Sequence, residues 1–167
     1  MKPYIICHMM ASVDGRIDCA MTSKINGVGE YYKTLDALDA PTTVSERITA
    51  TLEMAEQGFY IPKDKTAIGK TAFHKAADDD GYTVIADNKG RLKFNDAELD
   101  GQPLLLIVSE KAPKEYLSYL EHLGISWIAC GKERTDLKQA VEIMITEFGV
   151  ERMVVVGGPH INGAFLS

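Results

Sequence analysis

The second half of the chain alternates strand-like and helix-like segments, and this order constrains the fold more than any other feature. Apolar runs typical of buried strands occur at 103–109, 125–130 and 152–158. The two segments between them, 112–124 and 135–149, carry apolar residues at helical spacing and end in glycine. Strands and helices in this order, with short joints, require right-handed crossovers between parallel strands. The sequence therefore predicts an α/β fold with a mainly parallel central sheet and flanking helices.

The first half predicts further elements of the same kind. They are a buried strand at 3–10, helices at 29–38 and 45–58, and a strand at 82–87. Ser45 is a candidate N-cap for the second of these helices. The sequence contains no internal repeat, low-complexity segment or linker, so we expect one domain over residues 1–167.

Composition excludes several classes of protein. An apolar content of 46% with 25% charged residues is ordinary for a globular chain, and a net charge of −6 disfavours a nucleic-acid surface. No apolar run approaches the roughly 20 residues of a membrane helix. Cys7, Cys19 and Cys130 form no C-x-x-C pair, and neither they nor His8 and His160 have metal-ligand spacing. We therefore expect a reduced, cytoplasmic protein without a metal site, membrane partner or nucleic-acid partner.

The segment VVVGGPHINGAFLS, at 154–167, passes from a strand through Gly157 and Gly158 into a helix that begins near Pro159. Glycine lets the backbone approach a ligand closely, and the free N–H groups of a helix start favour a phosphate. In open α/β sheets, ligands lie outside the carboxyl ends of the strands. This joint is therefore a candidate phosphate site, although the local pattern fits a tight turn with positive φ equally well.

Polar residues beside other predicted strand ends are further candidates. Asp14, in SVDG, is placed to orient a substrate or relay a proton, and the alternative is a turn aspartate that binds its own backbone. Arg47 and Thr49, in SERIT, fit either a phosphate contact or a solvated helix face. Asp87 fits either a contact to a ribose hydroxyl or the opening of a turn.

The order of these segments resembles the RibD C-terminal domain, the reductase domain of riboflavin-biosynthesis enzymes, which has the dihydrofolate reductase fold. The matching stretches are PYIICHMMASVDGRI at 3–17, VSERIT at 44–49, VIADNKGRL at 84–92 and VERMVVVGGPHINGAFL at 150–166. The resemblance implies hydride transfer from NADPH to the ribosylamino C1 of 5-amino-6-(5-phosphoribosylamino)uracil, a small-molecule substrate whose sugar ring opens. In such a reaction the cofactor carries the chemistry and the protein supplies orientation, which suits a sequence without a catalytic triad.

The resemblance also implies roles for individual residues. Met10 and Ala11 would lie near the nicotinamide, and the region of Thr49 near the cofactor phosphates. The expected cofactor-binding residues are Met10, Ala11, Arg47, Thr49, Asp87, Gly157, Gly158, Pro159, His160, Ile161, Asn162, Gly163 and Ala164. The expected substrate-binding residues are Ser12, Asp14 and Val156, with Asp14 as the catalytic candidate.

The chain departs from the family pattern mainly on the substrate side. Val156 stands where riboflavin-type enzymes carry an acidic residue, Lys24 where they carry tryptophan, and Glu46 where a glycine is common. The zinc signature of the deaminase partner domain is absent, so a stand-alone reductase is expected. Two alternatives stay open: a same-fold reductase of a pterin or other small substrate, and a non-catalytic nucleotide-binding α/β protein.

The end of the sequence suggests an uncovered surface. Family members continue through further sheet strands after the position of Ser167, so the C-terminal strands are expected to be missing here. The helix from Pro159 is too short to be stable without tertiary support. An exposed strand edge and an apolar helix surface invite pairing. We therefore expect a protein that continues beyond Ser167 or forms a homodimer.

Overall fold

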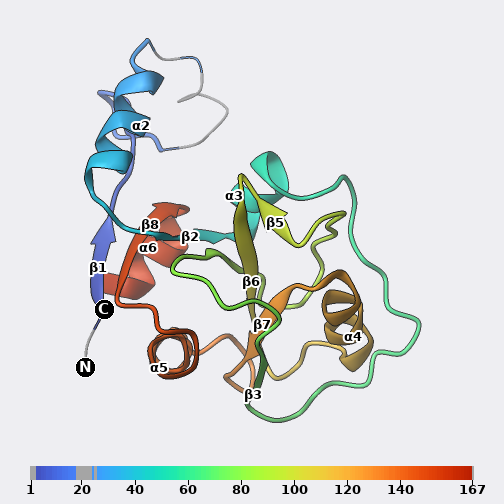
Figure 1. The fold of residues 1–167 in the computed structure, drawn as a ribbon. Coiled ribbons are helices and arrows are strands. Elements are labelled where there is room, and N and C mark those ends of the chain that lie inside the picture. The colour runs from blue at the N-terminus through green and yellow to red at the C-terminus, as the bar shows by residue number, and fades with distance from the viewer. Residues whose placement is uncertain (1–2, 18–23, 25, 167) are drawn as a thin grey trace.

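A mostly parallel sheet forms the centre of the fold (Figure 1). The computed structural model describes residues 3–17, 24 and 26–166. The strands are Tyr4–Cys7 (β1), Thr42–Glu46 (β2), Ala72–His74 (β3), Thr83–Ala86 (β4), Glu98–Leu99 (β5), Gln102–Val108 (β6), Ser126–Ala129 (β7) and Arg152–Gly157 (β8). Their order is β1-β8-β2-β4-β6-β7-β3, with β5 paired to β6 off this path. Only β3 and β5 run antiparallel to their neighbours.

Helices cover both faces of the sheet. They are Val28–Ala37 (α2), Arg47–Glu53 (α3), Lys114–Leu123 (α4), Leu137–Phe148 (α5) and Pro159–Leu166 (α6). Figure 1 shows α2 beside β1 at one end of the sheet and α4 near the other end. The predicted α/β class with a mainly parallel sheet is confirmed. No helix in the described part of the chain is long and apolar enough to cross a membrane.

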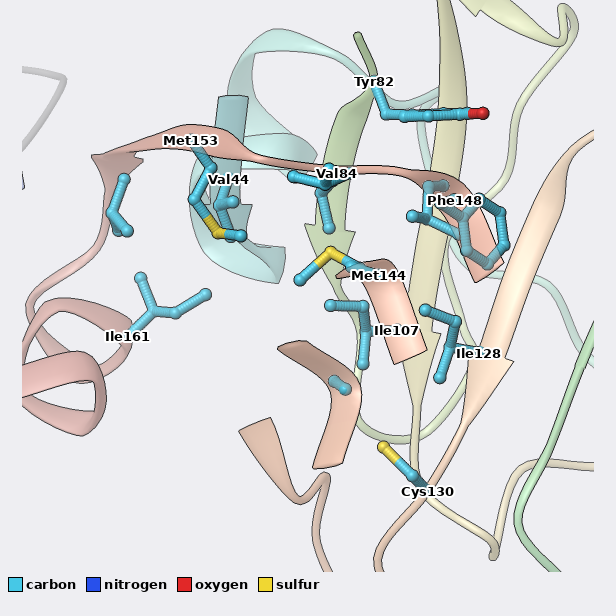
Figure 2. Close-up of a cluster of buried hydrophobic side chains, with 14 residues drawn as sticks. Val44, Tyr82, Val84, Ile107, Ile128, Cys130, Met144, Phe148, Met153 and Ile161 are labelled. Atoms are coloured by element: carbon cyan, nitrogen blue, oxygen red, sulfur yellow. The ribbon is translucent and has the colours of Figure 1, made fainter. Parts of the chain in front are cut away.

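The core is divided between the two faces of the sheet. On β6, Leu105 and Ile107 pack with α5 in one cluster, whereas Leu104 and Leu106 pack with α4 in the other. Figure 2 shows the first cluster, in which Met144 of α5 lies among side chains of the sheet. Because side chains alternate along a strand, a strand covered on both faces is apolar at every position. This is why the second half of the sequence predicted its strands correctly.

Two expectations for the first half were wrong. The strand at 3–10 was expected to be buried, but β1 is the edge strand and Tyr4 is 62% exposed. The helix expected at 45–58 begins at Arg47, and Ser45 lies in β2 rather than at an N-cap. β2 pairs with both β4 and β8, so the β-branched residues at 42–44 form an interior strand that helical periodicity did not reveal.

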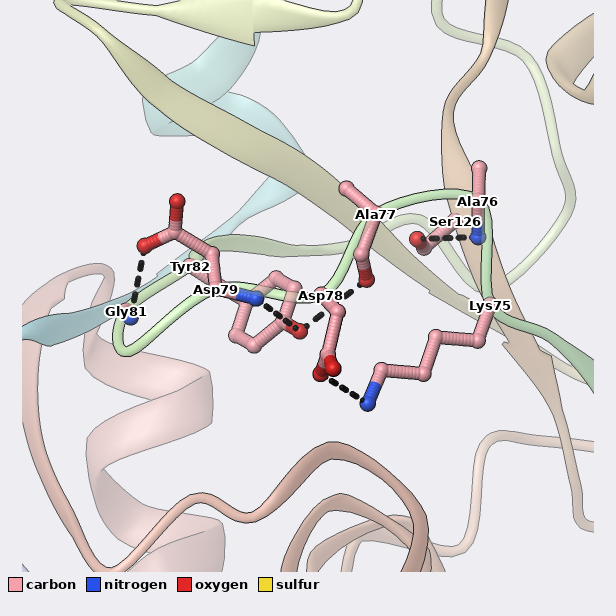
Figure 3. A network of polar contacts seen from close by, with 8 residues as sticks. All are labelled: Lys75, Ala76, Ala77, Asp78, Asp79, Gly81, Tyr82 and Ser126. Carbon is pink, nitrogen blue, oxygen red and sulfur yellow. Dashed lines mark hydrogen bonds and ion pairs between the residues drawn. The ribbon is translucent and has the colours of Figure 1, made fainter.

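The acidic segment between β3 and β4 is a loop whose aspartates at 78–80 are exposed. Its backbone is nevertheless well bonded (Figure 3). The Tyr82 hydroxyl accepts from the Asp79 N–H and donates to the Ala77 carbonyl, both at 3.1 Å. The Ala76 N–H donates to Ser126 Oγ at 3.0 Å, which fastens the loop to β7. The loop is therefore held in place by hydrogen bonds to the sheet, and it does not form part of the candidate site described below.

Candidate functional site

Three segments meet at the carboxyl edge of the sheet, around β8. β1 and β2 flank β8 and run parallel to it, so Cys7 pairs opposite Val155 and Ser45 opposite Gly157. Beyond this edge β1 continues into residues 8–10, β2 into α3, and β8 into α6. The carboxyl edge of an open parallel sheet is where such folds bind ligands.

A bulge in β8 directs Val156 into this edge. Val44 pairs opposite Val155 and Ser45 opposite Gly157, which leaves Val156 as an extra residue. Val156 is half-buried, and it borders two neighbouring cavities. The sequence predicted Val156 as a substrate contact, and its position on the wall shared by both cavities suits that role.

The smaller cavity, of about 110 Å³, lies against the backbone of the Gly157–Gly158 joint. Its lining comes from the end of β1 and from α2, α3 and β8: Met9, Met10, Ile17, Val28, Tyr31, Tyr32, Thr49, Glu53, Val156, Gly157 and Gly158. Thr49 packs directly on Gly157. Segments distant in sequence therefore form one pocket around the two glycines.

A carboxylate lies over the second glycine. Gly158 has a φ of +92°, and a Cβ at this position would lie 1.8 Å from Cδ of Glu46. The Glu46 side chain is only 12% exposed, and its Oε2 lies 3.6 Å from Nδ1 of His160. Both the backbone conformation and this close approach require glycine at position 158.

Aromatic contacts hold α2 against the end of β1. The ring of His8 stacks on that of Tyr31, with centroids 4.7 Å apart and planes 13° apart. His8 Nε2 also lies 3.3 Å from the Tyr31 carbonyl oxygen. Tyr32 meets Tyr31 edge-on at 5.3 Å. His8 therefore has a structural role, and it positions the aromatic wall of the smaller cavity.

A larger cavity of about 640 Å³ adjoins the first and shares Tyr31, Tyr32, Thr49, Glu53 and Val156 with it. The remaining lining comes from α2, α3, the sheet floor and the β5–β6 turn: Leu35, Thr43, Met54, Thr83, Leu99, Asp100 and Gln102. Its volume lies within the range of small-molecule sites. The charged side chains in its described lining are Glu53 and Asp100, both exposed carboxylates.

The structure brings together five of the predicted site residues: Met10, Thr49, Val156, Gly157 and Gly158. Asp14 and Ser12 lie instead in an exposed turn outside both linings. The Ser12 hydroxyl donates to the Asp14 carboxylate, which also lies 3.2 Å from Nε of Arg16. This geometry favours the turn role of Asp14, and Ala11 likewise lies outside both linings.

Two other predicted contacts, Arg47 and Asp87, lie outside both linings. The guanidinium of Arg47 lies over the ring of Phe59, 5.9 Å from its centroid. Asp87 is completely buried, and its Oδ2 accepts from the backbone N–H groups of Arg91 and Leu92. Burial, followed by the nearby Asp87 charge, raises the pKa of Tyr116 well above its ordinary value. Asp87 therefore closes a buried turn through Oδ2, and its expected ribose contact stays a prediction.

Residues 159–164 form the first turns of α6, and only its start lies near the smaller cavity. Ile161 is 4% exposed and belongs to the core cluster that contains Val155, which favours a structural role for its side chain. His160 contacts Glu46, and one buried oxygen of Asn162 has no hydrogen-bond partner. Pro159, Gly163 and Ala164 do not line either cavity. A helix turns successive side chains in different directions, so the six residues at 159–164 cannot all face one ligand.

Sequence reasoning missed several residues that line the site, above all Tyr31, Tyr32 and Glu53. They lie on α2 and α3, which were predicted as helices without a known orientation. The adjacent pair of tyrosines was the available signal, because two neighbouring aromatic residues on a short helix seldom both enter the core. Among the described residues, no group of His, Cys, Asp and Glu side chains is arranged to hold a metal ion.

A cleft at the carboxyl edge of a parallel α/β sheet is typical of nucleotide-binding domains. Within that class, the chain belongs to the RibD C-terminal domain family, whose model matches residues 3–167. It is also similar in structure to Acinetobacter baumannii RibD, form 2, with a TM-score of 0.63 and 18% identity. That match covers 99% of this chain, and the chain spans 42% of the length of that protein. The family is that of the riboflavin-pathway reductases, with a nucleotide cofactor.

The described residues fit a nucleotide cofactor with one exception. The side-chain-free backbone at Gly157 and the adjoining cavity leave room for a ligand beside Met10 and Thr49. At Gly158, however, the Glu46 side chain occupies the space in front of the backbone. A phosphate at Gly158 fits only when the Glu46 side chain turns away.

Proposed function

We propose that this chain is an NADPH-dependent reductase that reduces the ribosylamino C1 of a small aminopyrimidine. The observation that carries the proposal is the strand–Gly157–Gly158–helix joint, which borders a cavity continuous with a larger one in a member of the RibD C-terminal domain family. The reference substrate, implied by the sequence resemblance, is 5-amino-6-(5-phosphoribosylamino)uracil. NADPH, when bound, supplies a hydride to C1 while the C1–O bond of the sugar breaks and the released oxygen takes a proton from water.

The chain's own contribution is binding and orientation. Met10, Thr49 and the Gly157 backbone would hold the cofactor end of the cleft. Val156 lines both cavities. It would therefore lie beside the point where the reacting carbons of cofactor and substrate approach each other. The larger cavity would hold the substrate ring beside Tyr31 and Tyr32. Close approach of two carbons in a fixed orientation lowers the barrier without a strong general base.

A specific observation favours a second candidate, a same-fold reductase of an unphosphorylated substrate. Glu53 and Asp100 place two carboxylates in the lining of the larger cavity. A substrate phosphate would meet like charges there, whereas a neutral or cationic ring would not. The two candidates share the cofactor and differ in the charge of the substrate.

Titration calorimetry with NADPH tests the proposal. We expect NADPH to bind, and the aminopyrimidine to be reduced in its presence. Absence of NADPH binding to the folded chain would overturn the proposal, and binding without turnover of any reductase substrate would favour a non-catalytic nucleotide-binding protein.

The homodimer and the cytoplasmic location stay predictions. The exposed edge of β1, with Tyr4 at its start, supports pairing with a second chain. Light scattering of the purified protein tests the dimer. A monomer at micromolar concentration would remove it.

A further inference from the structure

The Glu46 side chain lies at the joint where β8 passes into α6. Its carboxyl carbon occupies the place that a side chain on Gly158 would take, 1.8 Å from the ideal Cβ position. Glu46 is the last residue of β2, and only 12% of its side chain is exposed. It is therefore packed against the joint and does not extend into solvent.

The surroundings of this carboxylate are those that a phosphate would have. The amino end of α6 carries a partial positive charge, and Nδ1 of His160 lies 3.6 Å from Oε2 of Glu46. Within the described part of the chain, no donor makes a hydrogen bond to the Glu46 carboxylate. The side chain is therefore held by packing and charge, and it can turn out into solvent without breaking a hydrogen bond.

We propose that Glu46 is a specificity-determining residue that acts as an internal anion at Gly158. A ligand phosphate can reach the Gly158 backbone only after the Glu46 carboxylate has moved out, and it is still repelled by the nearby charge. Glu46 therefore lowers the affinity for phosphate-bearing nucleotides and leaves the affinity for phosphate-free ligands unchanged. This inference rests on the proposed binding of NADPH at the joint.

Calorimetry with two ligands and matched variants tests the role of Glu46. The ligands are NADPH and reduced nicotinamide riboside, which lacks phosphate. The variants are Glu46→Ala, Glu46→Gln and the control Glu151→Gln, which removes one charge at the exposed amino end of β8. We expect Glu46→Ala to tighten NADPH binding about tenfold and Glu46→Gln about threefold, in line with the interaction of like charges near a protein surface. Riboside binding, and NADPH binding by the control, should change less than about twofold.

The outcomes separate this inference from the proposed function. Equal NADPH affinity in the wild type and both Glu46 variants would overturn the role of Glu46 and leave the proposed function standing. Equal tightening of NADPH and riboside would also overturn it, because charge selection would be absent. Failure of every folded form to bind NADPH would overturn the proposed function and the inference with it. Binding of NADPH by the wild type, with selectively tighter binding by Glu46→Ala, would support both. Thermal unfolding of each variant confirms that it is folded.

Discussion

Thr49 and Gly157 lie so close that a Cβ on Gly157 would be 2.7 Å from Oγ1 of Thr49. Thr49 belongs to α3 and is almost completely buried, whereas Gly157 ends β8. The contact therefore joins a helix to a strand more than a hundred residues further along the chain. Glycine is required here by packing, while at Gly158 both packing and a positive φ require it.

This contact predicts a coupled loss of stability. Gly157→Ala should lower the free energy of unfolding by about 1–3 kcal/mol, because the added methyl group overpacks the site. In a Thr49→Ala background the same change should cost at least about 0.5 kcal/mol less, because the two closest atoms, Oγ1 and Cγ2 of Thr49, are gone. Urea unfolding of the four proteins measures this coupling. Strictly additive losses would show that the backbone shifts to accommodate the methyl group.

Asp14 provides a test of the catalytic candidate. Its carboxylate is exposed and contacts Ser12 and Arg16, so we expect Asp14→Asn to leave NADPH affinity unchanged and kcat/KM within about twofold. Steady-state kinetics and calorimetry on the same preparation measure both quantities. A fall in kcat/KM of tenfold or more, with unchanged cofactor affinity, would restore the role of Asp14 in substrate orientation.

The carboxylates of the larger cavity predict substrate selection by charge. Asp100→Lys should increase kcat/KM for the phosphorylated aminopyrimidine about tenfold relative to its dephosphorylated riboside, because a repulsive charge becomes attractive. The matched control is Glu98→Lys, an exposed charge reversal on β5 outside the lining. Initial rates with the two substrates give the ratio. An equal ratio in both variants would mean that the phosphate does not approach Asp100.

Cys130 predicts a difference in thiol reactivity. Burial raises its pKa to about 11, so the thiol stays protonated at pH 8, whereas Cys7 is exposed. We expect iodoacetamide to modify Cys7 in the folded protein and Cys130 only in urea. The stability linked to the raised pKa is present below the ordinary value of 9.0 and is lost as the pH rises towards 11. Peptide mass spectrometry distinguishes these two cysteines from Cys19, which lies outside the described residues. Equal modification of Cys7 and Cys130 at pH 8 would show that the Cys130 thiol is accessible in the folded protein.

The sequence by itself determined the class of fold. Buried parallel strands such as β6 must be apolar on both faces, and α4 and α5 carry one apolar face each, so both periodicities are visible in the residues. The Gly157–Gly158 joint was also visible, because it places two adjacent glycines between a strand and a helix. These signals are local, and local backbone requirements are what a sequence expresses directly.

Only the tertiary structure decided which residues share the site. Strand order brings β1 and β2 to either side of β8, and no local pattern states that order. The same order makes β1 an edge, buries Asp87 and seats the Glu46 carboxylate on Gly158. The orientation of α2, which sets Tyr31 and Tyr32 beside the cavities, depends on its packing against His8. Contacts between residues far apart in sequence depend on how the elements pack, so a motif indicated where a ligand binds and the fold decided what surrounds it.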